Sequence, residues 1–366
     1  MCYQMPSRIH KPTVLIAFSG FVVAVVNFVL YLAASTNILC HSGFVAGRAF
    51  VEPRTITDSS INSTNLWSIQ LGIPEYGIQI VDSLLIASNT MCNEVLAFDE
   101  RNGNLVWSKV YSGPQSIVVD EGRKRVYIFG LWAWKRELLA LNTKTGDEIW
   151  LNNSLNNERG AISTYVLPDG RIFALSAHGL LSVNPDTGQF GNALSLSLPR
   201  TSLPLIQNGW FWSLSDSGLE ARDIDTGQMV WNSQYHGLSG CCLAQVYVGE
   251  HSLFLLHAGH LEALERQSGT LLWKFDEKTI VSNIAVTNNV LYGLSDDGTL
   301  LLLSVLTGNT LGYIRFQPPL SNAQESSPKL NGSQIVAHEE WIAIYFADRE
   351  MLSVYTINHS SIDDQD

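Results

Sequence analysis

Three histidines lie within ten residues of one another in this chain of 366 residues, at positions 251, 257 and 260. Imidazole nitrogens are common metal ligands, and the spacing of His257 and His260 would suit two ligands of one ion. Both, however, fall where an apolar run ends and the chain is expected to turn. We therefore predict structural or exposed roles for the histidines and no metal site.

Two adjacent cysteines, Cys241 and Cys242, stand just before an apolar run at 243–248. At the start of a strand they would pack as two small apolar side chains. Cys92 is either free or paired with one of them. With Cys2 and Cys40 the total is five, which does not make a disulfide framework.

Two acidic sequences, Asp296-Asp297-Gly298-Thr299 and Asp169-Gly170, resemble fragments of calcium-binding loops. Each is read more simply as a hairpin turn. The chain has no His-Glu-x-x-His, no glycine-rich phosphate loop and no Gly-x-Ser-x-Gly. The prediction is a protein that is not an enzyme, with no catalytic residues, no metal and no cofactor.

Four tryptophans alternate along two expected strands, at positions 132, 134, 210 and 212. Side chains two residues apart on a strand share a face, so Trp210 and Trp212 belong to one face of one strand. They could line a partner surface, but packing in the core is the expected role.

The elements that position these residues come from an internal repeat. Six glycines recur at intervals of 39 to 43 residues, at positions 103, 146, 188, 227, 269 and 308. The surrounding copies occupy 95–107, 138–150, 180–188, 219–231, 261–273 and 301–308. Further short strand patterns lie between them, which gives four strands per repeat of about 40 residues, the size of a propeller blade.

Each column of the repeat has a physical reason. The glycine stands where a hairpin turn needs a positive φ. Short polar residues precede it by one and by four positions, where they can cap the turn. The sixth residue before it is small in five copies, which suits close sheet packing. The fourth residue after it is Trp in four copies (107, 150, 231 and 273), where a ring can fill the space between sheets.

The pattern Ala-x-Asp-x-x-Thr-Gly-x-x-x-Trp resembles the repeat of pyrroloquinoline-quinone-type (PQQ-like) propellers and covers nearly all of 65–358. The third copy departs with Asn192 in the Trp column, and the sixth with Leu302 and Gly312. The resemblance implies two opposite functions: quinone-dependent dehydrogenases, or non-catalytic assembly factors such as the bacterial outer-membrane assembly lipoprotein and the luminal propeller of the ER membrane insertion complex.

The dehydrogenases carry a vicinal disulfide against the quinone, a bound calcium and a carboxylate base. Cys241 and Cys242 lie at roughly the equivalent place and are the weak alternative cofactor-binding residues. The sequence that follows them in those enzymes is absent here, and no acidic set for calcium can be picked out.

The blade count depends on how the ring closes. The sequence around Trp67 matches the last strand of a blade, and 341–346 and 351–357 supply strands without a following Trp. Joining these ends makes a composite blade. The predicted fold is therefore all-β, a seven-bladed propeller over 65–358, with eight blades the alternative.

The N-terminal region has a different character. No charged residue occurs from Pro12 to Gly47, and 13–34 is an apolar run that would span about 33 Å as a helix, enough to cross a bilayer. Arg8 and Lys11 precede it, which predicts a cytoplasmic tail (1–12) and a propeller on the non-cytoplasmic side. The alternatives are a signal peptide cleaved near Ala33, a lipoprotein cysteine, or a buried helix. Residues 35–64 are expected to be a linker, and 359–366 an acidic tail.

The formal net charge is −12, and the part from residue 48 onwards holds 20 basic and 34 acidic residues. Such an acidic body argues against nucleic acid binding. Four Asn-x-Ser/Thr sequons, at 62, 152, 331 and 358, would be used if the organism glycosylates the translocated domain.

The favoured function is a membrane-tethered scaffold or assembly factor that binds proteins through propeller faces or blade edges. A PQQ-dependent dehydrogenase and a sensor or adhesion ectodomain remain as alternatives.

Overall fold

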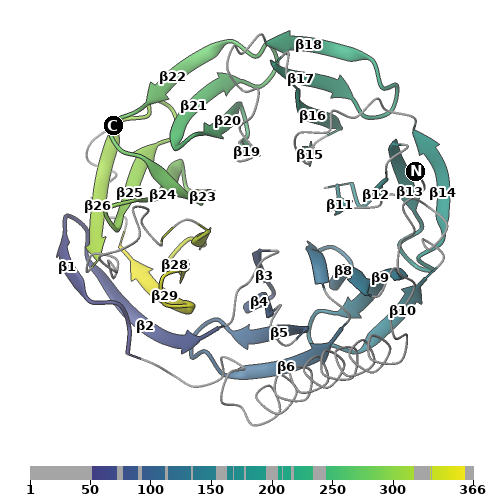
Figure 1. Cartoon of the computed structure of the whole chain (residues 1–366), viewed down its shortest axis with the longest axis horizontal. Coiled ribbons are helices and arrows are strands. Elements are labelled where there is room, and N and C mark those ends of the chain that lie inside the picture. The colour runs from purple at the N-terminus through teal and green to yellow at the C-terminus, as the bar shows by residue number, and fades with distance from the viewer. Residues whose placement is uncertain are drawn as a thin grey trace, which may run out of the picture.

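The computed structural model describes residues 52–71, 77–89, 93–111, 114–132, 135–153, 163–167, 169–176, 179–194, 205–207, 209–215, 218–233, 245–316, 330 and 332–358. In these residues the chain forms seven antiparallel sheets arranged radially around a central axis (Figure 1). The prediction of an all-β, seven-bladed propeller is confirmed, and the eight-bladed alternative is wrong because the described residues form seven sheets, one of which joins residues 63–70 to the last three strands of the propeller.

In the first six blades, four consecutive strands run in chain order from the axis to the rim. The first blade comprises β3 (Ile78–Val81), β4 (Leu84–Asn89), β5 (Glu94–Asp99) and β6 (Leu105–Val110). The second comprises β7 (Pro114–Asp120), β8 (Arg125–Trp132), β9 (Lys135–Asn142) and β10 (Glu148–Asn152). The third comprises β11 (Ser163–Val166), β12 (Ile172–Ser176), β13 (Gly179–Val183) and β14 (Phe190–Leu194).

The fourth blade comprises β15 (Leu205–Gln207), β16 (Trp210–Ser215), β17 (Gly218–Asp223) and β18 (Met229–Ser233). The fifth comprises β19 (Gln245–Val248), β20 (Ser252–His257), β21 (His260–Glu265) and β22 (Leu271–Phe275). The sixth comprises β23 (Ile280–Thr287), β24 (Val290–Ser295), β25 (Thr299–Ser304) and β26 (Thr310–Phe316). The seventh comprises β27 (Gln334–Ala337), β28 (Trp341–Phe346), β29 (Met351–Ile357) and, from the N-terminal side, β2 (Ser63–Gln70).

The ring closes as the sequence predicted. β2 pairs antiparallel with β29, from Ser63 opposite Ile357 to Gln70 opposite Met351. The Trp67 strand is therefore the outermost strand of the blade whose other three strands end the chain.

β1 (Ile56–Ser59) falls inside the expected linker 35–64 and was not predicted. β1 pairs antiparallel with β26, so the sixth blade has five strands. The expected tail 1–12, apolar segment 13–34 and acidic tail 359–366 lie outside the described residues. Within the part that the structure describes, no helix is long and apolar enough to cross a membrane.

The core is divided among the seven interfaces between adjacent blades, which we call seams. Each seam holds one cluster of buried apolar side chains contributed by the two blades on either side of it. No blade buries both of its faces alone, because each face is covered only when a neighbouring blade stacks on it. The core is therefore built by stacking the blades side by side.

The repeat glycines and tryptophans meet across the seams. All six hairpin glycines have φ between 70° and 73°, the left-handed conformation that glycine adopts without strain. A Cβ atom on Gly146, Gly188, Gly269 or Gly308 would lie 2.4–2.7 Å from the tryptophan ring of the preceding blade. The glycine is therefore required twice, once for the turn and once so that the ring can lie flat against it.

Each of these four rings, and also the ring of Trp67, is held by a hydrogen bond from its indole N–H. The acceptor is always the backbone carbonyl three residues before the next blade's hairpin glycine. The five bonds are Trp67 to Glu100 (2.7 Å), Trp107 to Thr143 (2.7 Å), Trp150 to Pro185 (2.7 Å), Trp231 to Arg266 (3.0 Å) and Trp273 to Val305 (3.0 Å). These five residues, which we call the clasping tryptophans, each connect two adjacent blades, so five of the seven seams have one.

Candidate functional site

Cys241 and Cys242, the weak alternative cofactor-binding residues, lie outside the described residues, and so does Cys92. The weak prediction that the pair touches a quinone therefore stays a prediction. In the described part of the chain, no group of three or more His, Cys, Asp and Glu side chains is placed to hold a metal ion.

The histidines take the positions expected of strand ends. His257 and His260 face each other across the β20–β21 turn with ring centroids 6.2 Å apart, and His251 is exposed. His257 Nε2 lies 3.7 Å from the buried carboxylate of Glu262, which forms a 2.7 Å ion pair with Lys274 Nζ. The Glu262 contact raises the pKa of Lys274 and keeps it charged. This cluster pairs its charges internally, as a structural group does.

The acidic sequences are hairpin turns. Asp297 accepts hydrogen bonds from the Ser295 hydroxyl (2.6 Å) and from the Thr299 amide (3.0 Å), and it pairs with Lys278 Nζ at 2.8 Å. Asp169 accepts the Arg171 amide at 3.0 Å and its guanidinium at 2.8 Å. Both sequences connect paired antiparallel strands, so the prediction of hairpin turns is confirmed.

Asp297 gives a pH-dependent prediction. Partial burial alone would raise its pKa, but hydrogen bonds from Lys278, Ser295 and Thr299 outweigh that effect and lower it. A lowered pKa stabilises the folded state above the unfolded value of about 3.9, and this stabilisation is lost as the pH falls through the folded value. Asp297→Asn should therefore destabilise by on the order of 1 kcal/mol at pH 7, since solvent screens a half-exposed side chain.

Chemical denaturation of the wild type and of Asp297→Asn between pH 7 and pH 3 measures this effect. The difference between the two proteins should be largest at neutral pH and shrink below about pH 4. A difference that grew on acidification would contradict the assignment.

Trp210 and Trp212 share one face of β16, as expected. Their rings stack with centroids 5.9 Å apart and an interplanar angle of 13°. Trp212 is fully buried, and both rings pack into the seam between the fourth and fifth blades. Core packing is confirmed for this pair. Trp132 ends β8, where its side chain is not described, and Trp134 lies outside the described residues.

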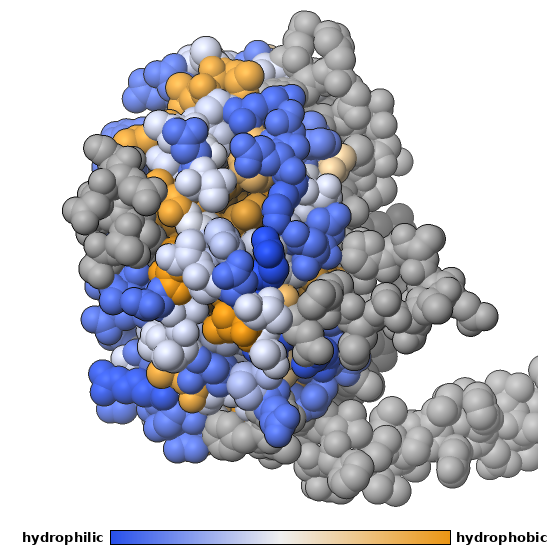
Figure 2. Space-filling model, turned by 90° about the vertical axis from the view of Figure 1, so that its left-hand side faces the viewer, coloured by the Kyte–Doolittle hydropathy of each residue, from blue (hydrophilic) through white to orange (hydrophobic). Residues whose placement is uncertain are grey.

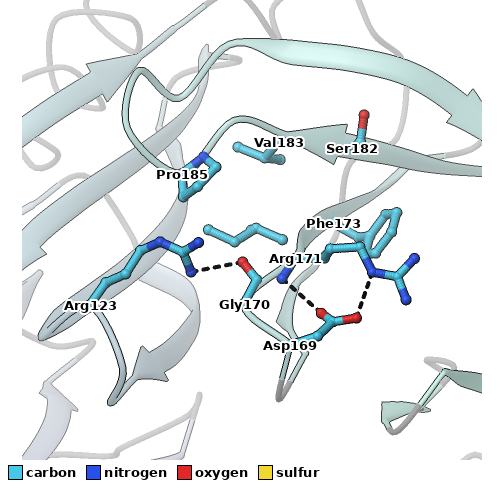
Figure 3. Close-up of a pocket in the computed structure, with 9 residues that line it drawn as sticks. Arg123, Asp169, Gly170, Arg171, Phe173, Ser182, Val183 and Pro185 are labelled. Atoms are coloured by element: carbon cyan, nitrogen blue, oxygen red, sulfur yellow. Dashed lines mark hydrogen bonds and ion pairs between the residues drawn. The ribbon is translucent and has the colours of Figure 1, made fainter.

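One shallow pocket of about 220 Å³ lies at the turns of the second and third blades (Figure 3). Arg123 Nη1 donates to the Gly170 carbonyl at 2.8 Å and pairs with Asp120 at 3.0 Å, and Arg171 pairs with Asp169. The volume is below the roughly 300–1,000 Å³ of small-molecule sites. Both guanidinium groups hold turns in place, which indicates a structural junction between the two blades.

The rim of the propeller carries the feature that sequence reasoning missed. The residue directly before the clasping tryptophan is a large apolar residue on five blades, and all five are exposed: Leu66, Val106, Ile149, Val230 and Leu272. Further exposed apolar residues on the same outer strands include Leu105, Val110, Leu151, Met229 and Leu271. The alternation around each Trp could have revealed them, because neighbours on a strand point to opposite faces.

On the side of the rim that Figure 2 shows, apolar residues form separate patches. Figure 2 views the side of the ring that carries β1, β22 and β26, and there apolar groups alternate with hydrophilic ones. Exposed outer strands with apolar side chains are edges to which another chain can add a strand. The rim, more than any pocket, is therefore the candidate functional surface.

The sequons divide by accessibility. Asn62 and Asn358 are exposed and adjacent, and the backbone N–H of Asn358 donates to the backbone carbonyl of Asn62 at 3.1 Å. The Asn152 side chain instead donates to the Gly188 carbonyl. Asn331 lies outside the described residues. Glycosylation at these positions stays a prediction.

The seven radial sheets, with a clasping tryptophan at five seams, define the class of PQQ-like β-propellers. A family model described as outer membrane protein assembly factor BamB matches residues 55–252 and 215–350, and the chain belongs to this family. A search of curated proteins by sequence found no match.

Solved structures show the same fold. BamB from Moraxella catarrhalis superposes with a TM-score of 0.55 at 16% identity, over 81% of this chain and 100% of that one. The β-propeller domain of Cps50 (Swd1) from Myceliophteria thermophila gives 0.59 at 9% identity, over 84% and 100%. The computationally designed Ika8 gives 0.53 at 12% identity, over 86% and 99%. At such identities the likeness concerns the fold alone.

Proposed function

We propose that this protein is a non-catalytic, membrane-tethered scaffold that binds other proteins and assists their assembly. The observation that carries the proposal is the rim, where outer strands on five blades present apolar residues to solvent. Membership of a family described as an outer membrane protein assembly factor supports the same reading. Strand addition to such edges uses main-chain hydrogen bonds for affinity and side-chain pockets for specificity.

The apolar segment 13–34 and the positive charges of Arg8 and Lys11 support a tether with the propeller on the non-cytoplasmic side. The described part of the propeller begins at Glu52. An acidic body keeps such a domain soluble next to a membrane surface.

Site-specific photocrosslinking tests the scaffold function directly. A crosslinker at Val110, which is 69% exposed at the end of β6, should capture a defined protein in native membranes. The control crosslinker replaces the exposed Lys144 in the β9–β10 turn. A membrane-assembly partner supports the proposal. Equal background capture at both positions, or capture only of an extracellular ligand, contradicts it and favours a sensor or adhesion ectodomain.

The alternative of a quinone-dependent dehydrogenase rests on Cys241 and Cys242. Titrating the purified protein with PQQ and calcium should leave the quinone absorbance unchanged. Saturable one-to-one binding that is abolished by Cys241→Ser with Cys242→Ser would contradict the scaffold proposal and establish the cofactor.

A further inference from the structure

Two of the seven outer strands lack the clasping tryptophan, and the place of the missing ring is filled in one of them and exposed in the other. In the sixth blade the position holds Gly312, and an ideal Cβ there would lie 2.5 Å from Ile61 Cδ1. Ile61 follows β1, the added fifth strand on β26, and it is buried in the seam between the sixth and seventh blades. An extended segment from elsewhere in the chain has therefore added an edge strand and put an apolar side chain where the ring is missing.

In the third blade the position holds Asn192. The pairing of Phe190 with Val183 and of Ala193 with Leu181, with the irregularity between them, matches Glu148 with Leu141 and Leu151 with Leu139 in the second blade. Asn192 thus occupies the place of Trp150. It is exposed, whereas Trp150 is 9% exposed.

The surface of the fourth blade that faces β14 across this seam is also partly exposed. Gly227 is the hairpin glycine that a tryptophan from the third blade would cover, and it is partly exposed. The other five hairpin glycines are buried. The register is kept but the ring is absent, and we call the place between β14 and the Asp223–Gly227 turn, where the ring would lie, the slot.

The wall of the fourth blade is polar where its counterparts are apolar. Glu220 and Arg222 face the third blade and form a 2.9 Å ion pair. The corresponding positions of the first blade are Leu96 and Phe98, both buried in their seam. The pair is 17% and 27% exposed, so it offers an acceptor and a donor beside the slot.

β14 is the last strand of its sheet, and among the described residues no strand pairs with its outer edge. We propose that the third blade is completed by a partner protein, through an extended segment that adds to β14 as a fifth strand and seats a large apolar side chain over Gly227. β1 on β26 provides the template within the same molecule. Asn192 is exposed in the single chain, so the slot beside it is the place where a side chain of the partner would bind.

This inference rests on the proposed scaffold function and assigns it one edge and one type of ligand: an extended segment with an aromatic or large aliphatic anchor. Five of the other edges keep their tryptophans, and the edge of the sixth blade is already paired with β1, so an incoming strand has no slot to fill there. The third blade is thereby distinguished from the rest of the rim.

The test uses a fluorescein-labelled, end-blocked peptide with the sequence of residues 56–62 and the change Ile61→Trp. Anisotropy should show saturable binding to the wild-type chain. The same peptide with Ile61→Ala should bind about tenfold more weakly or worse, because the buried anchor is lost. In the chain, Asn192→Trp should fill the slot from within and weaken binding by at least about the same factor.

The matched control is Ser108→Trp, which adds a tryptophan at an exposed position of β6 and should leave binding unchanged. Amide hydrogen exchange of the wild-type chain should show peptide protection at 190–194 and none at 229–233, which does not depend on the folding of any variant. No binding, equal binding by a folded Asn192→Trp chain, or protection elsewhere would overturn the proposal. Self-association of the chain through β14 would also overturn it, by assigning the edge to a second copy. Crosslinking at Val110 concerns a different blade, so the scaffold function and this inference can fail separately.

Discussion

Asp348→Ala is expected to lower the free energy of unfolding by about 3–5 kcal/mol, although Asp348 belongs to none of the six copies of the repeat. The segment before β1 places Arg54 against the β28–β29 turn, where its Nη1 lies 2.7 Å from one Asp348 oxygen and 2.9 Å from the other. Both side chains are 0% exposed. Removing the carboxylate takes away the two charge-assisted hydrogen bonds that compensate for the burial of the guanidinium.

The environment of Arg54 explains the size of this effect. Burial lowers the pKa of its guanidinium, and the charge of Asp348 acts in the opposite direction. The guanidinium carbon also lies 4.9 Å from the centre of the Phe346 ring. Arginine nevertheless stays charged at any ordinary pH, so the cost of burying this charge cannot be relieved by deprotonation.

A second ion pair on the same N-terminal segment serves as the control. Asp58 and Arg315 are 3.8 Å apart and about half exposed, at 50% and 48%. Asp58→Ala should cost less than about 1 kcal/mol. Replacing the buried pair together, by Arg54→Met with Asp348→Leu, should recover most of the stability, because both desolvated charges are removed. Urea unfolding of the four proteins decides the matter: equal losses for Asp348→Ala and Asp58→Ala would contradict the prediction.

The repeat was readable from sequence because each blade repeats the same local problem. The glycine, its polar neighbours and the tryptophan are fixed by a turn and a seam that recur every 40 residues or so, and Trp67 marked the closing strand. The Arg54–Asp348 pair joins residues 294 positions apart, and no local pattern connects them. β1 was missed for a related reason: its sequence, Ile-Thr-Asp-Ser, has no apolar alternation, since its pairing satisfies backbone groups at an edge.

The candidate site was less readable than the fold. The sequence directed attention to cysteines, histidines and acidic turns, because those residue types carry chemistry. The described histidines and acidic turns instead pair within the structure. Asn192 and Gly312 were visible as departures from the tryptophan column, but only the three-dimensional structure shows that Ile61 replaces one missing ring and that the other place is open.

The second large effect is expected at a seam that keeps its tryptophan. Trp107→Ala should lower the free energy of unfolding by about 3–5 kcal/mol, the usual cost of deleting a large buried side chain. Trp107 is 7% exposed, packs in the seam between the first and second blades, and covers Gly146. Its indole N–H donates to the Thr143 carbonyl at 2.7 Å. The substitution leaves both a cavity and a buried carbonyl without its donor.

Trp107→Phe separates these two contributions. It keeps most of the apolar volume but removes the donor, so it should cost about 1–2 kcal/mol, near the value of one buried hydrogen bond. The matched control is Asn192→Ala, at the same position of the repeat in the blade without a ring. Because Asn192 is exposed, that change should stay within about 0.5 kcal/mol. If Asn192→Ala cost as much as Trp107→Ala in urea unfolding, the slot at the third blade would not be open, and the contrast between clasped and unclasped seams would fail with it.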